Sequence, residues 1–274
     1  RYTGAAWTPV SDEIVFRACK EEAARHDVGD KGLRKVADDA ARLMVAESIR
    51  DGDPLGLMDE PKSVINCRNG ELWIDSVGGV ELRKHDPSSF LTSCLPIDYD
   101  PAAACPRFDR ALLEIFAKSE DPAAMARHWG EFLGYLIQPS RKIASWWLLH
   151  GRGGNGKSFL MDVAEALLPQ SAVLSVNIGE WSKRQFARGQ LLSKLLVKDD
   201  DVDSKTVIPD GFLKTISERK TLTGEKKFKD EFNFVSVALP VLLANGWPSL
   251  SDPSDGTQRR VRVIPFRRSF SREG

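Results

Sequence analysis

The feature that most constrains the fold of this chain is the stretch Gly151-Arg152-Gly153-Gly154-Asn155-Gly156-Lys157-Ser158. It follows an apolar run from Ile143 to Leu149, and an amphipathic pattern begins at Lys157. A strand, a glycine-rich turn and a helix in this order form a phosphate-binding loop. The glycines let backbone N–H groups approach phosphate oxygens, and the helix N-terminus adds positive potential. The sequence therefore predicts a site for a nucleoside triphosphate.

The side chains of this loop have separate expected tasks. Lys157 reaches the β- and γ-phosphates, and the Ser158 hydroxyl takes a place on the metal ion. The expected cofactors are ATP and Mg²⁺. The residues expected to contact them are Gly151, Gly153, Gly154, Asn155, Gly156, Lys157, Ser158 and Phe159.

The composition excludes several classes of protein. The 274 residues are 28% charged and 42% hydrophobic, which is typical of neither disordered nor membrane proteins. No apolar run approaches about 18 residues and no signal peptide opens the chain, so we expect a cytoplasmic or nucleoid location and no membrane partner. The four cysteines lack C-x-x-C spacing, which favours reduced thiols over a zinc site. Because the net charge is zero, any nucleic-acid site must be a local patch.

Hydrophobic periodicity predicts the organisation of the chain. Helical patterns cover residues 12–26 and 36–47, and β-type runs fill 64–98, with hairpin turns at Asn69-Gly70 and Gly78-Gly79. Residues 107–137 return to a helical pattern.

From about residue 143, strand and helix patterns alternate, which indicates a mainly parallel sheet with helices on both faces. The expected fold class is therefore α/β, with a P-loop domain at residues 119–274. A smaller α+β domain is expected to precede it at residues 1–118. The chain begins at Arg1 without a methionine, so we expect a piece of a longer protein.

A second chemical element follows the next apolar run, where Asp199, Asp200 and Asp201 come directly after Leu191–Lys198. After a P-loop, one carboxylate of such a group orients Mg²⁺ and a neighbour polarises the attacking water. Strand alternation alone puts Asp199 and Asp201 on one face and Asp200 on the other. We favour Asp200 and Asp201 for metal and water, with Asp199 as a neighbouring ligand. A solvated acidic loop is the alternative.

A third apolar run, residues 235–244, ends at Asn245-Gly246-Trp247-Pro248. An amide at the tip of a strand beside the P-loop can sense the γ-phosphate and hold the attacking water. The alternative is an asparagine in an ordinary turn, to which Asn-Gly is well suited. The position of Asn245 after the acidic strand favours the functional interpretation.

A basic segment closes the chain, with six arginines between residues 259 and 272 and no acid among them. Arg259 and Arg260, at its start, are placed to reach the γ-phosphate of a neighbouring subunit, where an arginine neutralises charge in the transition state. A basic strip for nucleic acid and a solvated tail are the alternatives.

In this order, the motifs resemble the helicase part of the phage, plasmid and poxvirus primase-helicases, which belong to superfamily 3 of the DNA helicases. Three further stretches resemble the domain that precedes the motor in that family, namely Asn66–Leu72, Tyr99-Asp100-Pro101 and Cys105-Pro106-Arg107-Phe108. One more stretch, Leu222-Thr223-Gly224-Glu225, resembles the segment ahead of a basic hairpin in that family. The resemblance runs from about residue 10 to 270.

This resemblance implies an AAA+-like ATPase fold. It also implies a ring-forming homo-oligomer, expected to be a hexamer, which translocates on single-stranded DNA. It implies ATP hydrolysis by Lys157, Ser158 and the acids at 199–201, with Asn245 as the γ-phosphate sensor. Arg259 or Arg260 would be the finger supplied in trans. The expected setting is a bacterial host cell, with a primase domain or primase partner.

The resemblance also implies that Lys226, Lys227 and Lys229 lie on a hairpin facing the channel of the ring, with Lys214 as a weaker candidate for DNA contact. From the residues alone, these lysines form either a phosphate-contacting cluster or a solvated turn. The chain departs from the family at Asp201, where glutamate is common, and these residues include no primase half. The leading hypothesis is a replicative DNA helicase. The alternatives are a replication initiator, a DNA-packaging ATPase without unwinding activity, and a small-molecule kinase.

Overall fold

The computed structural model describes residues 2–8, 10–25, 30–48, 63–138, 141, 143–184, 187–218, 220–225, 231–251 and 255–270. The chain divides into two units. One lies within Arg1–Pro61 and His85–Thr92, and the other within Lys62–Lys84 and Ser93–Gly274.

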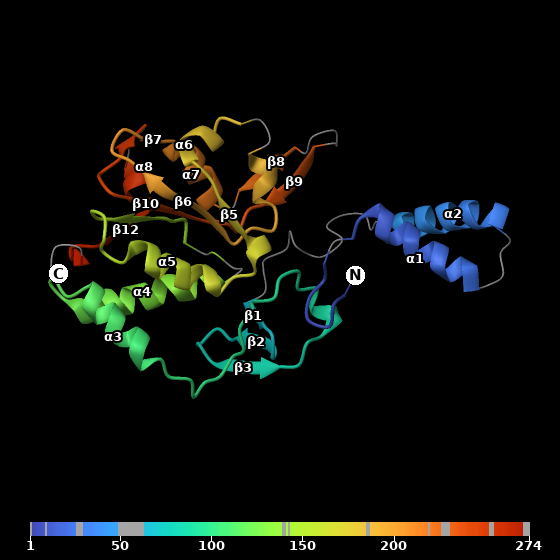
Figure 1. The fold of residues 1–274 in the computed structure, drawn as a ribbon, viewed down its shortest axis with the longest axis horizontal. Coiled ribbons are helices and arrows are strands. Elements are labelled where there is room, and N and C mark those ends of the chain that lie inside the picture. Colours follow the sequence, from blue (N-terminus) through green and yellow to red (C-terminus); the bar gives the residue numbers. More distant parts are fainter. Residues whose placement is uncertain are drawn as a thin grey trace. The chain divides into compact units, whose positions relative to one another are not determined.

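The first unit is built on a pair of helices, α1 (Asp12–Arg25) and α2 (Asp30–Ser48), which pack against each other (Figure 1). These helices confirm the two helical patterns. Their buried contacts are small, with Cys19, Ala23 and Ala37 in the interior. A short 3-10 helix, η1 (Pro87–Ser89), completes the unit.

A three-stranded antiparallel sheet opens the second unit, with β1 (Val64–Cys67), β2 (Gly70–Ile74) and β3 (Val80–Arg83) in that order. Both predicted hairpin turns are confirmed. Gly70 has a φ of 151°, and a Cβ atom there would lie 2.3 Å from the carbonyl oxygen of Arg83. Only glycine therefore fits this turn without a shift of the backbone.

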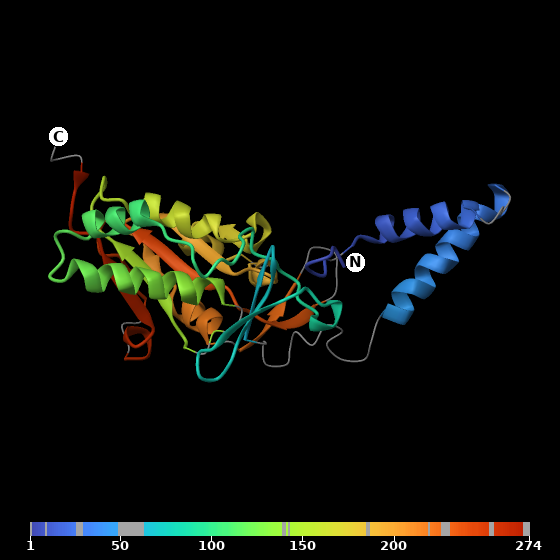
Figure 2. The same ribbon diagram turned by 90° about the horizontal axis from the view of Figure 1, so that it is seen from below.

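A five-stranded parallel sheet forms the centre of the second unit, in the order β12-β4-β10-β6-β5. This sheet, with helices on both faces and a smaller part before it, confirms the predicted fold class (Figures 1 and 2). The strands are β4 (Trp146–His150), β5 (Val173–Ser175), β6 (Leu196–Val202), β10 (Leu239–Ala244) and β12 (Val261–Pro265).

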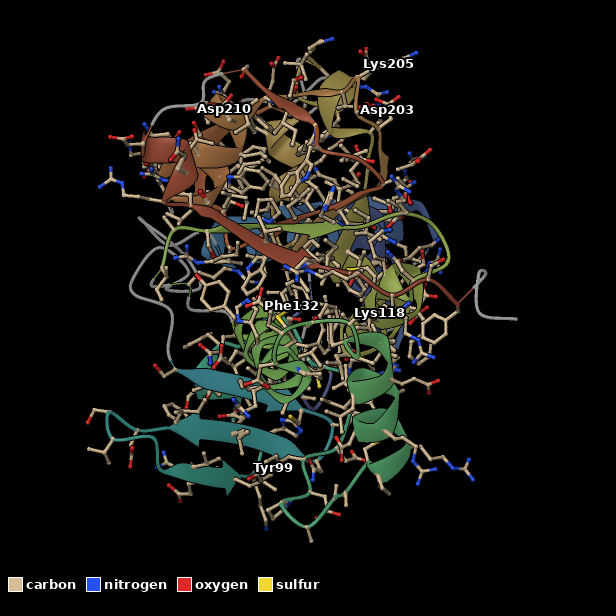
Figure 3. All side chains as sticks on the ribbon, turned by 90° about the vertical axis from the view of Figure 1, so that its left-hand side faces the viewer. Tyr99, Lys118, Phe132, Asp203, Lys205 and Asp210 are labelled. Atoms are coloured by element: carbon tan, nitrogen blue, oxygen red, sulfur yellow. The ribbon has the colours of Figure 1, made fainter. Side chains whose placement is uncertain are left out.

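Alternating side chains of the strands supply two separate cores. In β4, Trp147 and Leu149 belong to one core, and Trp146 and Leu148 belong to the other. Since the strands are covered on both faces, they read as nearly continuous apolar runs. Figure 3 shows Phe132 in the layer between the parallel sheet and the small antiparallel sheet, and Asp210 beyond the opposite face.

The helices are divided between these cores. The core that contains Phe132 is shared by α3 (Pro106–Ile115), α4 (Pro122–Ile137) and α5 (Lys157–Ala166). The other core is covered by α6 (Ile178–Trp181) and α7 (Asp210–Ser217), and α8 (Asp255–Gln258) packs against α7.

The remaining elements are short and connect the strands and helices. Each two-stranded pair lies outside the main sheet. The 3-10 helices are η2 (Gln170–Ala172) and η3 (Arg188–Leu191). The strand pairs are β7 (Val207–Ile208) with β11 (Ser249–Leu250) and β8 (Thr221–Gly224) with β9 (Phe232–Val235).

Three strand boundaries differ from the predicted ones. Strand β4 begins at Trp146, and Ile143 is exposed rather than part of a buried strand. The expected run 235–244 is divided between β9, which pairs with β8, and β10, which lies in the parallel sheet. The acidic residues lie within β6 instead of after it. The predicted division of the chain at residues 118 and 119 falls between α3 and α4 and stays a prediction.

A buried guanidinium fastens α4 to the sheet. Arg141 donates to the carbonyl oxygens of Tyr135, Leu136, Leu195 and Val237. Two of these acceptors belong to the last turn of α4. Of the other two, Leu195 directly precedes β6 and Val237 lies two residues before β10. Burial lowers the pKa of Arg141 to about 10.

Candidate nucleotide site at the carboxyl edge of the sheet

The loop between β4 and α5 depends on glycine at both of its ends. A Cβ atom on Gly151 would lie 2.3 Å from the carbonyl oxygen of Phe266. Gly156 has a φ of 88°, and a Cβ atom there would lie 3.0 Å from the side chain of Ile115. The glycines that bring the backbone N–H groups toward a phosphate therefore also allow β12 and α3 to pack against the loop.

Lys157 lies inside this loop and is only 6% exposed. Its Nζ donates to the carbonyl oxygen of Gly151, to Asn155 Oδ1 at 3.2 Å and to Asn245 Oδ1 at 3.2 Å. Burial lowers the pKa of Lys157. All of these acceptors are neutral, so the anionic oxygens of a triphosphate would be stronger partners for the same ammonium group.

Asn245 follows β10, the strand that lies between β4 and β6. Its side-chain oxygen meets Lys157 across a sequence separation of 88 residues. The structure thus brings together two side chains that were selected from separate motifs.

The loop is also braced by the residues after β12. The Phe270 N–H donates to the carbonyl oxygen of Gly154 at 2.7 Å, and the Phe266 N–H donates to that of His150 at 2.7 Å. Asn155, which is buried, donates from Nδ2 to the carbonyl oxygen of Phe266 at 3.4 Å. Sequence reasoning missed this contact, and no motif in residues 266–270 signals it.

The acidic residues of β6 do not alternate regularly. Asp199 lies opposite Leu242 and Val202 lies opposite Ala244, so the strand has an extra residue at the acids. Asp199 is buried, whereas Asp200 and Asp201 are both exposed. The expectation that Asp199 and Asp201 share one face, which assumed a regular strand, is therefore wrong.

The carboxylate of Asp199 is occupied by backbone groups. Its Oδ2 accepts from the Ile178 N–H at 2.7 Å, and its Oδ1 accepts from the Asp201 N–H at 3.1 Å. These bonds fix the start of α6 against β6. We expected Asp199 in the metal site, but its geometry fits a structural task better.

Asp200 is engaged with a lysine on its own strand. Lys198 Nζ lies 2.7 Å from Asp200 Oδ2 and 2.5 Å from Glu165 Oε1. Burial opposes the charge of Lys198, but the bonds to Asp200 and Glu165 outweigh it and raise the pKa of the lysine. Lys198 therefore joins β6 to α5, and Asp200 is held by this lysine.

Asp201 is left with an exposed carboxylate that makes no hydrogen bond or ion pair with the described residues. Ser158, at the start of α5, is also exposed. Within the described ranges, no three His, Cys, Asp or Glu side chains form a metal-binding group. This suits Mg²⁺, which is usually held by one or two protein oxygens together with phosphate oxygens and water. The residues that would hold it are Ser158 and Asp201.

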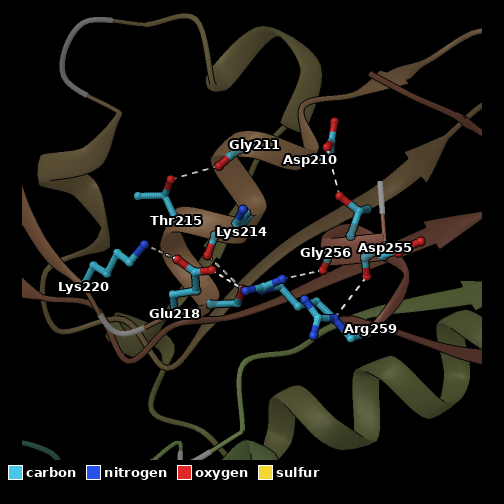
Figure 4. Close-up of polar contacts among 12 residues, drawn as sticks. Asp210, Gly211, Lys214, Thr215, Glu218, Lys220, Asp255, Gly256 and Arg259 are labelled. Carbon is cyan, nitrogen blue, oxygen red and sulfur yellow. Dashed lines mark hydrogen bonds and ion pairs between the residues drawn. The ribbon is translucent and has the colours of Figure 1, made fainter. Parts of the chain in front are cut away.

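The two arginines after α8 have different surroundings. Arg260 is paired with Glu218, the residue that follows α7, and its Nη1 donates to the carbonyl oxygen of Gly256. Arg259 is exposed and donates from Nε to the carbonyl oxygen of Asp255 at 3.3 Å (Figure 4). Of the pair, Arg259 is the more exposed and makes no ion pair with the described residues.

The predicted DNA-contacting lysines are only partly visible. Lys214 lies on α7 with its side chain exposed. Lys226, Lys227 and Lys229 lie outside the described residues.

An aromatic pair at the end of β4 was not anticipated from the sequence. The rings of His150 and Trp247 are stacked, with centroids 4.1 Å apart and planes at 22°. Burial lowers the pKa of His150, and the nearby charge of Lys157 lowers it further. The imidazole is therefore held in its neutral form beside the phosphate-binding lysine.

Two families match the chain. Residues 1–117 match a family described as D5 N terminal like, and residues 149–260 match a family of unknown function, DUF5906. A protein of Acanthamoeba polyphaga mimivirus named "Putative helicase" is 25% identical over 233 residues, which are 82% of this chain and 24% of the viral protein. The chain thus spans about a quarter of the length of this relative.

Among solved structures, the apo C-terminal region of NrS-1 is similar, with a TM-score of 0.52 and 20% sequence identity. The match covers 73% of this chain and 46% of that chain. At this identity the similarity concerns the fold alone. Within the described part of the chain, no helix has both the length and the apolar character needed to cross a membrane.

Proposed function

We propose that this chain, which joins a D5 N-terminal-like region to a P-loop module of the superfamily 3 helicase type, is the motor of an ATP-driven DNA helicase. The observation that carries the proposal is the contact between Lys157 and Asn245 at the carboxyl edge of the parallel sheet. A phosphate-binding lysine and a strand-tip amide that meet at 3.2 Å support hydrolysis of a bound triphosphate, because both can address the γ-phosphate.

The residues of the site have distinct roles in this proposal. Lys157 binds the β- and γ-phosphates, and Asn245 holds the attacking water. Asp201 accepts a hydrogen bond from that water and, with Ser158, holds Mg²⁺. The metal ion, when bound, neutralises charge that develops on the phosphate oxygens. Arg259 adds a guanidinium to the site of an adjacent subunit.

In this proposal the motor acts on single-stranded DNA as a ring, which is hexameric by analogy with the family that the chain resembles. A composite site between subunits requires a homo-oligomer, and the exposed position of Arg259 supports one. The lysines at 226, 227 and 229 would contact the DNA backbone as point charges. A primase domain or partner would belong to the longer protein.

The test is the rate of ATP hydrolysis with and without single-stranded DNA. We expect stimulation by DNA, and we expect Lys157→Ala to lower kcat by roughly 10²–10³, which is the usual effect of removing one group that stabilises transition-state charge. Lys183→Ala is the matched control, because Lys183 is an exposed lysine that pairs with Glu180 on α6.

Three outcomes separate the candidates. Hydrolysis that DNA does not stimulate, together with no strand separation by a longer chain, would contradict the helicase proposal. Stimulated hydrolysis without strand separation would favour an initiator or a packaging ATPase. A burst of ADP that depends on a small acceptor molecule and not on DNA would favour a kinase.

A further inference from the structure

Both ends of helix α7 make contacts that hold α8 or the residues directly after it. At the start of α7, the buried Asp210 accepts from Thr257 Oγ1 at 3.0 Å and from the Ser251 hydroxyl. At the other end, Glu218 follows the helix and is paired with Arg260 (Figure 4). The position of α8, and hence of the arginine pair that follows it, is therefore set by α7.

The two carboxylate oxygens of Glu218 have different partners. Oε1 contacts Arg260 Nη2, and Oε2 lies 2.6 Å from Lys220 Nζ. Lys220 directly precedes β8, which pairs with β9 to form an antiparallel hairpin. The carboxylate of Glu218 thus connects Lys220, the residue before the hairpin, to Arg260 at the candidate ATP site.

The charges of this group are partly shielded from solvent. The side chains of Glu218 and Arg260 are 12% and 18% exposed, whereas that of Lys220 is 67% exposed. The hydrogen bond from Lys220 and the charge of Arg260 lower the pKa of Glu218, with a smaller contribution from Lys214. Glu218 is therefore ionised at neutral pH, and its bond to Arg260 is screened less than a surface ion pair.

The guanidinium of Arg260 is not fully satisfied in this arrangement. Its Nε is buried and has no hydrogen-bond partner among the described residues. Since a buried donor without a partner is costly, a second arrangement in which Nε meets another acceptor would recover part of that cost. An element with two arrangements is what coupling between two sites requires.

From these contacts we propose that Glu218 is a positioning residue that couples the β8–β9 hairpin to the arginine pair. Displacement of Lys220 by the hairpin reorients the carboxylate of Glu218, and this shifts Arg260 together with Arg259 beside it. The inference rests on the proposed function, because it assigns the hairpin to DNA and the arginines to ATP.

The experiment compares Glu218→Gln, Glu218→Asp and the control Glu180→Gln. The control removes the same charge from an exposed carboxylate that also pairs with a lysine, Lys183. For each protein we would measure kcat and KM for ATP with and without single-stranded DNA. Thermal unfolding would establish that the variants are folded.

We expect Glu218→Gln to lower the stimulation by DNA about three- to tenfold, the size usual for residues that carry coupling between sites. The KM for ATP should change by less than about twofold, because the partners of Glu218, Lys220 and Arg260, lie outside the phosphate-binding loop. Glu218→Asp should recover part of the stimulation, since it keeps the charge. If Glu218 had only a structural role, its variants would change the thermal stability and the basal rate of ATP hydrolysis without a selective loss of stimulation by DNA.

If Glu218→Gln does not fold, Lys220→Met tests the same link from the side of the hairpin, where the side chain is exposed. It too should lower the stimulation by DNA. If DNA stimulates the wild-type protein and the folded Glu218 and Lys220 variants to the same extent, this inference alone is overturned. A wild-type protein that DNA does not stimulate would overturn the proposed function and this inference with it.

Discussion

Two adjacent arginines, Arg259 and Arg260, share their chemistry and differ in their partners. Arg260 is paired with Glu218, and removing either side chain would leave the other charge poorly compensated. Arg259 makes one hydrogen bond, to a carbonyl oxygen of α8. At the scale of residues, the candidate for a guanidinium supplied to another subunit is therefore Arg259, and Arg260 is the one that sets its position.

A second residue-scale prediction concerns the protonation of His150. Burial lowers the pKa of folded His150 from its ordinary value of 6.5. As the pH falls below that value, the unfolded chain takes up a proton that the folded chain does not bind. The free energy of unfolding must therefore fall as the pH decreases through this range.

The variant His150→Phe retains a ring that can stack on Trp247 and cannot be protonated. We expect its free energy of unfolding to decrease less between pH 7.5 and pH 5.5 than that of the wild type, in urea titrations at both pH values. Equal decreases in the two proteins would show that His150 does not contribute to the pH dependence.

At the scale of elements, Arg141 holds the end of α4 against the starts of two strands. Its guanidinium is the shared donor for four backbone carbonyl oxygens, of which that of Leu195 also accepts from the Leu239 N–H at 2.8 Å. Hydrogen bonds from a charged group are stronger than neutral ones, and buried acceptors left without a donor are costly. The junction between the helical layer and the sheet therefore depends on one side chain.

We expect Arg141→Met to lower the free energy of unfolding by about 3 kcal/mol or more, measured by urea denaturation. The control is Arg188→Met, in which an exposed arginine is replaced and a change within about 0.5 kcal/mol is expected. A loss at position 141 no larger than that of the control would mean that water satisfies the four carbonyl oxygens.

At the scale of the whole molecule, the site is incomplete within one chain if Arg259 acts on the ATP of a neighbour. A mixture of two inactive variants tests this. Lys157→Ala lacks the phosphate-binding lysine, and Arg259→Ala lacks the guanidinium, which is worth about 10³–10⁵ in rate when supplied in trans. Mixed rings should recover part of the ATPase activity, because some interfaces combine an intact Lys157 with an intact Arg259.

The measurement is the rate of hydrolysis against the mixing ratio, with the particle mass determined by native mass spectrometry. A mixture in which Arg260→Ala replaces Arg259→Ala is the comparison, since Arg260 is held within its own chain. Activity that stays at the sum of the two variants, in particles shown to be oligomeric, would argue against a composite site.

The features that the sequence predicted correctly depend on local patterns. The glycines of the loop, the apolar runs of β4 and β10 and the turn at Asn69-Gly70 can be read without long-range contacts, because backbone conformation and side-chain periodicity are properties of short segments. The parallel sheet followed from the alternation of these segments. The order of the motifs then carried the resemblance to a helicase family.

What only the tertiary structure decided is which member of each polar group is free. Asp199 is occupied because the Ile178 N–H reaches it across 21 residues, and Arg260 is occupied because Glu218 reaches it across 42. Neither partner can be identified from neighbouring residues, since a hydrogen bond or ion pair between distant segments exists only once the chain has folded. The local sequence therefore determined that this edge of the sheet would carry acids and arginines, and long-range packing left Asp201 and Arg259 as the exposed members without an ion pair among the described residues.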